Sequence, residues 1–308
     1  MLPETLDELR QQEFINKKQY EEMEPFIAGR KISVYYELRT LLYAGVLLFT
    51  GGLGVLIYKN IGELGHIVSI AILAIATFAC FGYGILRGPS YSRGKVLPPN
   101  GYYDYVVLLA SLLSIIVQGY LQYQYALFDN SLEWNTLLSA ILFFAIAYRY
   151  DHTGVLALAI TALASFFGLS LSPREWYASD FLDEARLHWI AIGLGVTLGS
   201  VALWLGARSI KSHFTFTYLN FSLLLFFGGS VAGLFMENTY YIFLALIYAG
   251  SFFAYRQAVQ NHSFIFLLYA FLCAYIGTTY LLADWVFESE PTLWFYYSII
   301  SCGGSSIS

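Results

Sequence analysis

Residues Leu41–Tyr58 read LLYAGVLLFTGGLGVLIY, and this stretch decides the fold class. Its eighteen residues carry no charge, and small residues recur in it at Gly51, Gly52 and Gly54. At about 1.5 Å of rise per residue, a helix of this length nearly crosses the hydrocarbon core of a bilayer. The stretch therefore predicts a membrane-spanning helix.

The composition extends this prediction to most of the chain. Hydrophobic residues make up 58% of the sequence, charged residues make up 12%, and the mean hydropathy is +0.59. Soluble domains carry about 25% charged residues, so too few charges remain here to cover a water-soluble globule. No basic face points to nucleic acid. The three cysteines lie in apolar runs without His or Asp at ligand spacing, so no disulfide framework, zinc site or cofactor is predicted.

Apolar runs separated by short polar breaks predict an all-α, polytopic transmembrane bundle of about ten spans, which contacts membrane lipids. The final run is too short to cross a core of about 30 Å, so it is either re-entrant or part of a chain that continues past Ser308; we favour the second. The predicted transmembrane domain covers residues 38–302, followed by a tail at 303–308. Its spans lie near residues 38–58, 64–86, 104–125, 132–149, 154–171, 188–207, 214–236, 239–255, 263–283 and 291–302.

Residues 1–37 form a polar head before the first span. Apolar residues recur at helical spacings within residues 4–28, which predicts a short helical hairpin. One interpretation is a module that binds a cytoplasmic protein or mediates oligomerisation. The other is a solvated amphipathic segment that leads into the membrane, because so short a pair can barely bury a core.

The Lys and Arg residues predict the orientation of the chain. With the N-terminus inside, thirteen of the sixteen fall in inner segments, which by the positive-inside rule places the head in the cytoplasm and the protein in the cell's inner membrane. The inner residues are Arg10, Lys17, Lys18, Arg30, Lys31, Arg39, Arg87, Arg93, Lys95, Arg149, Arg208, Lys211 and Arg256.

Two sequence echoes predict parallel repeats built from two-span hairpins. LLFTGG at residues 47–52 recurs as LLFFGG at 224–229, and AYR with DHT at 147–153 recurs as AYR with NHS at 254–263. The alternative is chance similarity between apolar segments. The second echo also predicts that His152 and His262 cap the helices that follow them.

The head and first span together resemble a known family. The residues that carry the resemblance are Leu6, Leu9, Ile15 and Tyr20 in the head, and Gly45, Gly51, Gly52, Gly54 and Asn60 around the first span. They are similar to the domain-of-unknown-function family numbered 2157, a family of predicted bacterial membrane proteins, over about the first 90 residues. The resemblance implies a multi-pass fold and, because the family has no established activity, no site residues.

The predicted spans carry no Asp, Glu, Lys or Arg away from their ends. Ion-coupled transporters place an ionisable group near the midplane, so an ion-coupled antiporter is disfavoured, whereas a permease for a neutral or lipid-like substrate is not. Metalloprotease, hydrolase, P-loop and dinucleotide-binding motifs are absent from the sequence. We therefore predict no catalytic residues, and an enzyme is disfavoured.

Uncharged polar residues and small residues mark the candidate sites within the spans. Gln118 and Gln122 lie one helical turn apart, and with Thr278 and Thr279 they are candidates for lining a polar cavity; the alternative is hydrogen bonding between helices. Glycines predict close helix packing at Gly51, Gly52, Gly195, Gly199, Gly229 and Gly233.

The outer segment of residues 172–188 is the strongest candidate for a metal site. Glu184 and His188 are spaced by one helical turn and Asp180 is near them in sequence, so together they are candidate ligands for a cation. The alternative is an interfacial helix whose charges face water.

Two function classes fit these observations. The first is a permease or flippase-like carrier of a neutral or amphiphilic substrate, which should contain a cavity. The second is a non-catalytic membrane scaffold or sensor whose head binds a cytoplasmic partner. The architecture favours the carrier by analogy alone. The sequence leaves the oligomeric state open.

Overall fold

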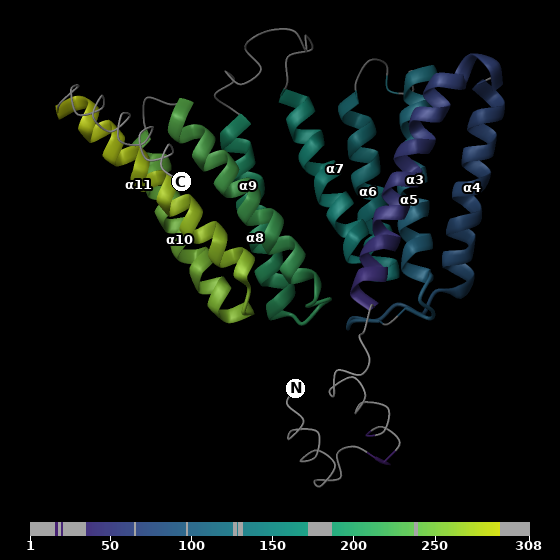
Figure 1. Cartoon of the computed structure of the whole chain (residues 1–308), viewed down its shortest axis with the longest axis horizontal. Helices are drawn as coiled ribbons and strands as arrows, with labels where there is room; N and C mark the ends of the chain where they lie inside the picture. The colour runs from purple at the N-terminus through teal and green to yellow at the C-terminus, as the bar shows by residue number, and fades with distance from the viewer. Residues whose placement is uncertain are drawn as a thin grey trace, which may run out of the picture. The chain divides into compact units, whose positions relative to one another are not determined.

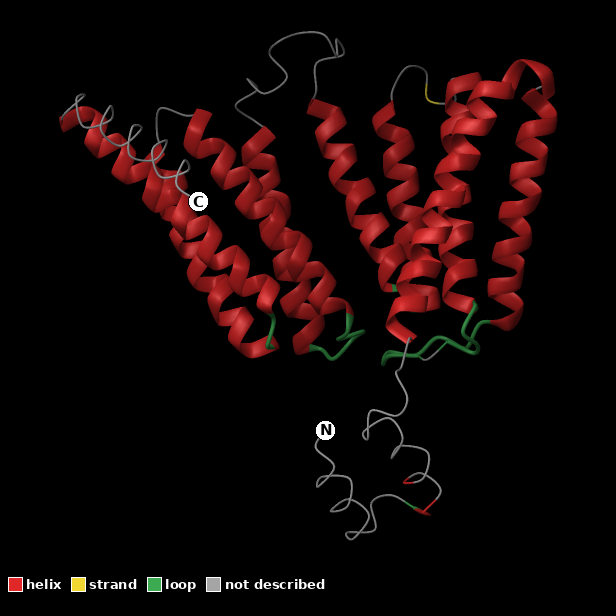
Figure 2. Cartoon of the chain, viewed as in Figure 1, coloured by secondary structure: helices red, strands yellow, loops and turns green. Residues whose placement is uncertain are grey.

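The computed structural model describes residues 16–17, 20, 35–64, 66–96, 98–125, 128, 132–171, 187–236 and 240–289. Its long elements in these ranges are all α-helices, which confirms the all-α prediction (Figures 1 and 2). They are α3 (Tyr35–Leu64), α4 (His66–Arg87), α5 (Tyr103–Tyr125), α6 (Leu132–Tyr150), α7 (Thr153–Leu171), α8 (Leu187–Ala207), α9 (Phe214–Met236), α10 (Tyr240–Asn261) and α11 (Phe264–Ser289).

The chain forms two compact units, Met1–Ala71 and Ile72–Ser308. The first unit contains α3 and the beginning of α4, and the second contains the rest of α4 and α5–α11. Most of the helical hairpin predicted in the head (residues 4–28) and all of the predicted final run (residues 291–302) lie outside the described residues.

Each predicted span from 38–58 to 263–283 coincides with one helix. The main differences are at C-terminal ends, because α3 continues to Leu64, α10 to Asn261 and α11 to Ser289. An apolar run marks the part of a helix that lipid can cover, whereas backbone hydrogen bonding continues through polar residues beyond it. Eight of the described helices are long and apolar enough to cross a membrane; α6 is less apolar, but it packs along α5 and α7.

Three junctions in the second unit share one backbone geometry. In each, an amide two or three residues past the end of a helix donates to a carbonyl in its last turn, and the residue before that amide has a positive φ. This is the Schellman ending, which usually uses glycine. The bonds are His152 N to Ala147 O (3.1 Å), Ile210 N to Leu205 O (3.1 Å) and Ser263 N to Ala258 O (3.0 Å), with φ of 60° at Asp151, 52° at Ser209 and 48° at His262.

This geometry corrects one prediction drawn from the sequence echo. His152 does cap α7, because its Nδ1 accepts the amide of Val155 at 3.1 Å. His262, however, occupies the positive-φ position that Asp151 occupies in the earlier junction, and Ser263 takes the position of His152. The echo in sequence is therefore displaced by one residue in the structure, and His262 does not stand at the cap position of α11.

Within the second unit the helices form two groups that we name for use below. The first helix group is α5–α7, and the second helix group is α8–α11 (Figure 1). In the second group α9 packs against α8, α10 and α11, and the groups meet where α7 contacts α8 and α9. We call the end that carries the α6–α7, α8–α9 and α10–α11 junctions the junction end.

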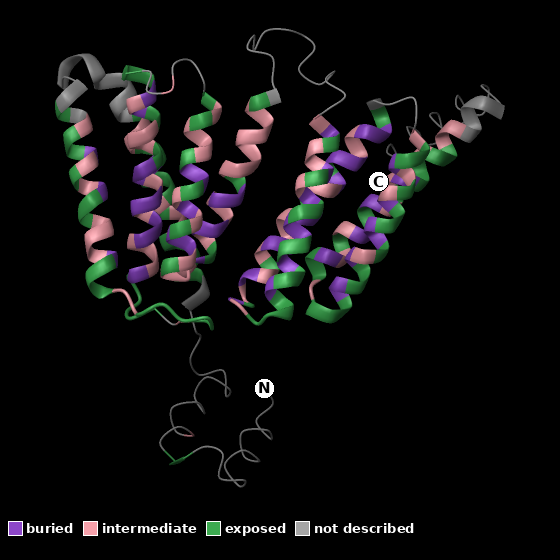
Figure 3. Ribbon diagram, turned by 180° about the vertical axis from the view of Figure 1, so that it is seen from behind, coloured by how far each residue is buried: buried purple, intermediate pink, exposed green. Residues whose placement is uncertain are grey.

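Burial varies around the helices rather than from one end of the bundle to the other (Figure 3). On α10 and α11 large apolar side chains face outward, with Phe252 71% exposed, Phe271 64% exposed and Tyr275 68% exposed. Such a surface is unfavourable in water and suits lipid contact.

Candidate functional site

The four candidate cavity residues lie on two helices in different groups. On α5, Gln118 accepts a hydrogen bond from the Ser139 hydroxyl of α6 at 2.8 Å, and buried Gln122 accepts the Phe128 amide at 3.1 Å. On α11, Thr278 donates to the carbonyl of Ala274 at 2.7 Å. Thr278 and Thr279 are both exposed. The structure does not bring the two pairs together.

Of the three candidate metal ligands, Asp180 and Glu184 lie outside the described residues. His188 lies in the first turn of α8, where it is only 4% exposed. Its ring centre is 5.6 Å from that of Trp189 and 5.1 Å from that of Phe243, so its surroundings are largely aromatic. Among the described residues no three His, Cys, Asp or Glu side chains are grouped closely enough to hold a metal ion.

Four of the candidate packing glycines lie at close contacts between helices, and the other two lie in the middle of α3. A Cβ added to Gly195 would lie 2.8 Å from the amide nitrogen of Phe226, and one added to Gly199 would lie 2.7 Å from Ser222 Oγ. Both therefore face α9 at close range. A Cβ at Gly229 would lie 2.6 Å from the carbonyl of His188, and one at Gly233 would overlap the ring of Phe243. Gly51 and Gly52 lie in the middle of α3.

A buried charged cluster at the junction end joins the two helix groups. It consists of Asp151, from the α6–α7 junction, with Lys211 and His213, from the α8–α9 junction; we call these three residues the junction cluster. Lys211 Nζ lies 3.1 Å from Asp151 Oδ1, and His213 Nε2 lies 2.6 Å from the same oxygen. The side chains of Lys211 and Asp151 are 1% and 3% exposed, and that of His213 is 17% exposed.

The local backbone positions each member of the cluster. Asp151 is the positive-φ residue that ends α6, so its side chain leaves the helix at the turn instead of following the helical face. Lys211 also has a positive φ, 48°, and its carbonyl accepts the Phe214 amide at 2.8 Å where α9 begins. Non-glycine residues in this region carry backbone strain of about 1–3 kcal/mol each. The tertiary contacts must therefore hold them there.

A third segment, the α4–α5 connection, completes the cluster. The Val96 amide donates to Asp151 Oδ2 at 2.5 Å, and the Lys211 amide donates to the carbonyl of Arg93 at 2.8 Å. The ring of Tyr91 lies 5.2 Å from Lys211 Nζ, a cation–π distance. One carboxylate thus connects three chain segments that are far apart in sequence.

Burial also sets the protonation of His213. Removal from water lowers the pKa of its imidazole below the ordinary value of 6.5, and the nearby cations Lys211 and Lys95 act in the same direction. The Asp151 carboxylate opposes this shift without overcoming it. At neutral pH the His213 imidazole is therefore neutral.

Aromatic contacts continue from the cluster into the bundle. The hydroxyls of Tyr148 on α6 and Tyr218 on α9 lie 3.1 Å apart, and the ring of Tyr148 meets that of Phe214 edge-on at 5.3 Å. These contacts also link the two helix groups at the junction end. The arrangement is chemically suited to closing that end of the bundle, because it fills the space between the groups with paired charges and rings.

The sequence alone does not reveal this cluster as a site. In the sequence, Lys211 contributes only to the predicted orientation of the chain, and Asp151 appears only within a repeated motif whose histidine, His152, is expected to cap a helix and does so. The signal that could have found the cluster is the Lys-Ser-His run at 211–213, between two spans in a very short junction. So short a junction keeps its side chains beside the helix ends.

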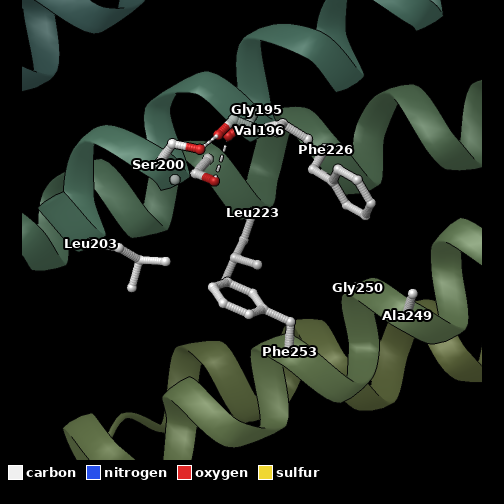
Figure 4. A pocket seen from close by; sticks show the side chains of 11 residues that line it. Gly195, Val196, Ser200, Leu203, Leu223, Phe226, Ala249, Gly250 and Phe253 are labelled. Atoms are coloured by element: carbon white, nitrogen blue, oxygen red, sulfur yellow. Dashed lines mark hydrogen bonds between the residues drawn. The ribbon is translucent and has the colours of Figure 1, made fainter.

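A separate hollow of about 310 Å³ lies between α8, α9 and α10 (Figure 4). Its lining comes from these three helices and does not include Gln118, Gln122, Thr278 or Thr279. The hollow is therefore not the polar cavity that these four residues were expected to line.

Residues 7–156 match a family described as predicted membrane protein (DUF2157). This confirms the resemblance found in the sequence and extends it beyond the first 90 residues. No curated protein and no solved structure matches the chain.

Proposed function

We propose that this chain, whose residues 7–156 match the predicted membrane protein family DUF2157, is a flippase-like carrier of an amphiphilic substrate. In this proposal the two helix groups move against each other, and the junction cluster closes the bundle at one end. The observation that carries the proposal is the buried Asp151–Lys211 pair between the groups.

A buried ion pair is a poor device for static stability. Removing two charges from water costs several kcal/mol per ion, and apolar replacements of similar size are often neutral or stabilising. Asp151 and Lys211 are also both held at positive φ, which adds strain. When the two junctions separate, the charges of Asp151 and Lys211 regain hydration and their backbone strain is released. Both effects favour opening, so the pair is suited to a contact that opens and closes.

The orientation of the chain predicts which side of the membrane the closed end faces. With the N-terminus in the cytoplasm, as the Lys and Arg distribution predicts, the junction end faces the cytoplasm. Arg93, Lys95 and Arg149 are exposed near the same end. The carrier would then be closed toward the cytoplasm in the conformation described here.

Thiol accessibility tests whether the closure opens. In a protein with Cys80, Cys273 and Cys302 replaced by Ala, Tyr218→Cys places a reporter thiol at a position that is 4% exposed and next to the cluster. A membrane-impermeant maleimide added from the junction side should label it slowly. Asp151→Asn should raise that rate about tenfold or more, because loss of the carboxylate removes well over 1.4 kcal/mol from the closed state.

The matched control is Asp284→Asn. Asp284 accepts the Tyr240 hydroxyl at 2.7 Å within the second helix group, so its removal should leave labelling unchanged. Transport is measured in the same proteoliposomes as flipping of fluorescent phospholipids. If Asp151→Asn leaves labelling unchanged and the protein moves no lipid beyond protein-free vesicles, the carrier is wrong, and the alternative of a scaffold or sensor is favoured.

A further inference from the structure

The hollow between α8, α9 and α10 lies near the middle of the membrane. Gly199 on its wall is eight residues from the end of α8 at Ala207 and twelve from its start at Leu187. At about 1.5 Å per residue these distances are roughly 12 and 18 Å, within a hydrocarbon core of about 30 Å. Lipid headgroups do not reach this depth, whereas acyl chains do.

The walls of the hollow are apolar in effect, although two serines contribute to them. Ser200 donates its hydroxyl proton to the carbonyl of Val196 at 2.8 Å, and Ser222 donates to that of Gly195 at 2.7 Å. A serine has one proton to donate, so neither has one left for a ligand. Apolar cavities of this kind stay free of water and accept apolar molecules.

Close packing of the helix backbones leaves the hollow unfilled. Gly195 brings α8 against the backbone of α9, and Gly250 receives the ring of Phe226, where an added Cβ would collide with it. Neither glycine has a side chain that could occupy the space between the three helices. Figure 4 shows Leu203, Leu223 and the ring of Phe253 around it, with Gly250 and Phe253 on the same helix, α10.

The hollow opens on the outer surface of α8. Val196 and Leu203 are 52% and 46% exposed, and Ser200 is also exposed. At the depth calculated above, the medium outside this opening is the hydrocarbon of the bilayer. The volume of about 310 Å³ is at the lower end of the range for ligand pockets, about 300–1,000 Å³.

We propose that this hollow binds a single acyl chain of a membrane lipid, with the methyl end of the chain at the midplane. The inference names the substrate class of the proposed carrier and rests on that proposal only for the biological role of the bound lipid. The binding itself is argued from the depth of the hollow, its dry wall and its lateral opening. A polar solute is disfavoured because the serine hydroxyls offer it no proton.

Photocrosslinking in proteoliposomes of the full chain tests the site. Two phospholipids are compared, one with a diazirine at the end of its acyl chain and one with a diazirine next to the headgroup. The terminal diazirine should crosslink to residues of the hollow on α8, α9 and α10, and the headgroup-proximal one should not. Crosslinked peptides are identified by mass spectrometry.

A matched pair of variants on α10 separates the hollow from the rest of the lipid-facing surface. Ala249→Phe places a ring at the wall of the hollow and should lower terminal crosslinking there about tenfold, because overfilling an occupied space is unfavourable. Ala245→Phe, one turn earlier and also exposed, should leave it unchanged. Both changes are at exposed positions, so neither should prevent folding.

The outcomes distinguish this inference from the proposed function. Crosslinking spread evenly over the lipid-facing surface, or equal effects of the two variants, would each overturn the acyl-chain site. Crosslinking confined to the hollow in a protein that flips no lipid would support the site and refute the carrier, because binding is measured without transport.

Discussion

Replacing Asp151 by Asn should be among the most destabilising single changes at the junction end. The substitution keeps the size of the side chain, and its amide oxygen can still accept the Val96 amide. It removes the negative charge that pairs with Lys211, whose side chain is only 1% exposed. The ammonium is then left buried beside an amide that cannot neutralise it.

The loss of stability in each variant depends on how many partners the remaining charged residue keeps. Breaking a buried ion pair by removing one partner costs about 3–5 kcal/mol, so Asp151→Asn should lower the free energy of unfolding by about that amount. Lys211→Met should cost less, about 1–3 kcal/mol, because Asp151 keeps His213 and the Val96 amide. The double variant should be more stable than the sum of the two effects predicts, with a coupling of about 0.5–3 kcal/mol.

The assay is unfolding of the purified protein in mixed micelles, titrated with denaturing detergent and followed by circular dichroism. Asp284→Asn is the control, because it removes a hydrogen-bonded carboxylate that faces a tyrosine instead of a cation and should cost about 0.5–1.5 kcal/mol. The reasoning is refuted if Asp151→Asn costs no more than this control, or if the effects at Asp151 and Lys211 simply add.

Three other changes test separate features. The pKa of His213 is lowered by burial, so the folded state resists its protonation and stability should fall as pH drops below 6.5; His213→Gln should flatten this dependence in unfolding measured at pH about 7.5 and 5.5. Gly195→Ala should lower stability by about 1–3 kcal/mol because its Cβ meets the backbone of α9, whereas Gly193→Ala, with nothing within 4 Å, should raise it by up to about 1 kcal/mol; thermal unfolding that ranks them the other way contradicts the packing argument. His152→Ala should cost about 1–3 kcal/mol, because it removes both the cap on α7 and the contact of Nε2 with the Asp104 carbonyl at 2.9 Å, while His152→Asn should keep the cap alone; equal melting temperatures of the Ala and Asn variants would show that the cap contributes little.

The helices of this protein were predictable because their signals are local. An apolar run of suitable length between polar breaks defines a span by itself, and the described spans match helices α3–α11. The helix ends were less predictable where polar residues continue the helix, as at Arg256–Asn261. Periodicity and hydropathy identify the part of a helix that lipid can cover. They do not predict the residue at which its backbone hydrogen bonding ends.

The site was not predictable in the same way, because its residues look ordinary in sequence. Lys211 is one of many cations expected on the inner side, and Asp151 is an acid in a turn. Their burial depends on how the α6–α7 and α8–α9 junctions meet, which no local pattern contains. The hollow likewise arises from contacts of Gly195 and Gly250 with neighbouring helices. A glycine pattern predicts that two helices approach closely, but it does not predict the volume left between three of them.

The three Schellman junctions also bear on how the protein is made. Each closes with a hydrogen bond between residues five positions apart, so each hairpin can form soon after its second helix enters the membrane, at a small entropic cost. The contact between Val96 and Asp151 spans 55 positions, and the carboxylate still has to wait for Lys211 on a later hairpin. Until that lysine arrives, Asp151 is an unpaired acid at the membrane boundary. We expect the pair to mark the arrival of the α8–α9 junction, before α9–α11 are complete, which makes it a natural point for quality control to distinguish chains in which the two helix groups have met from shorter ones.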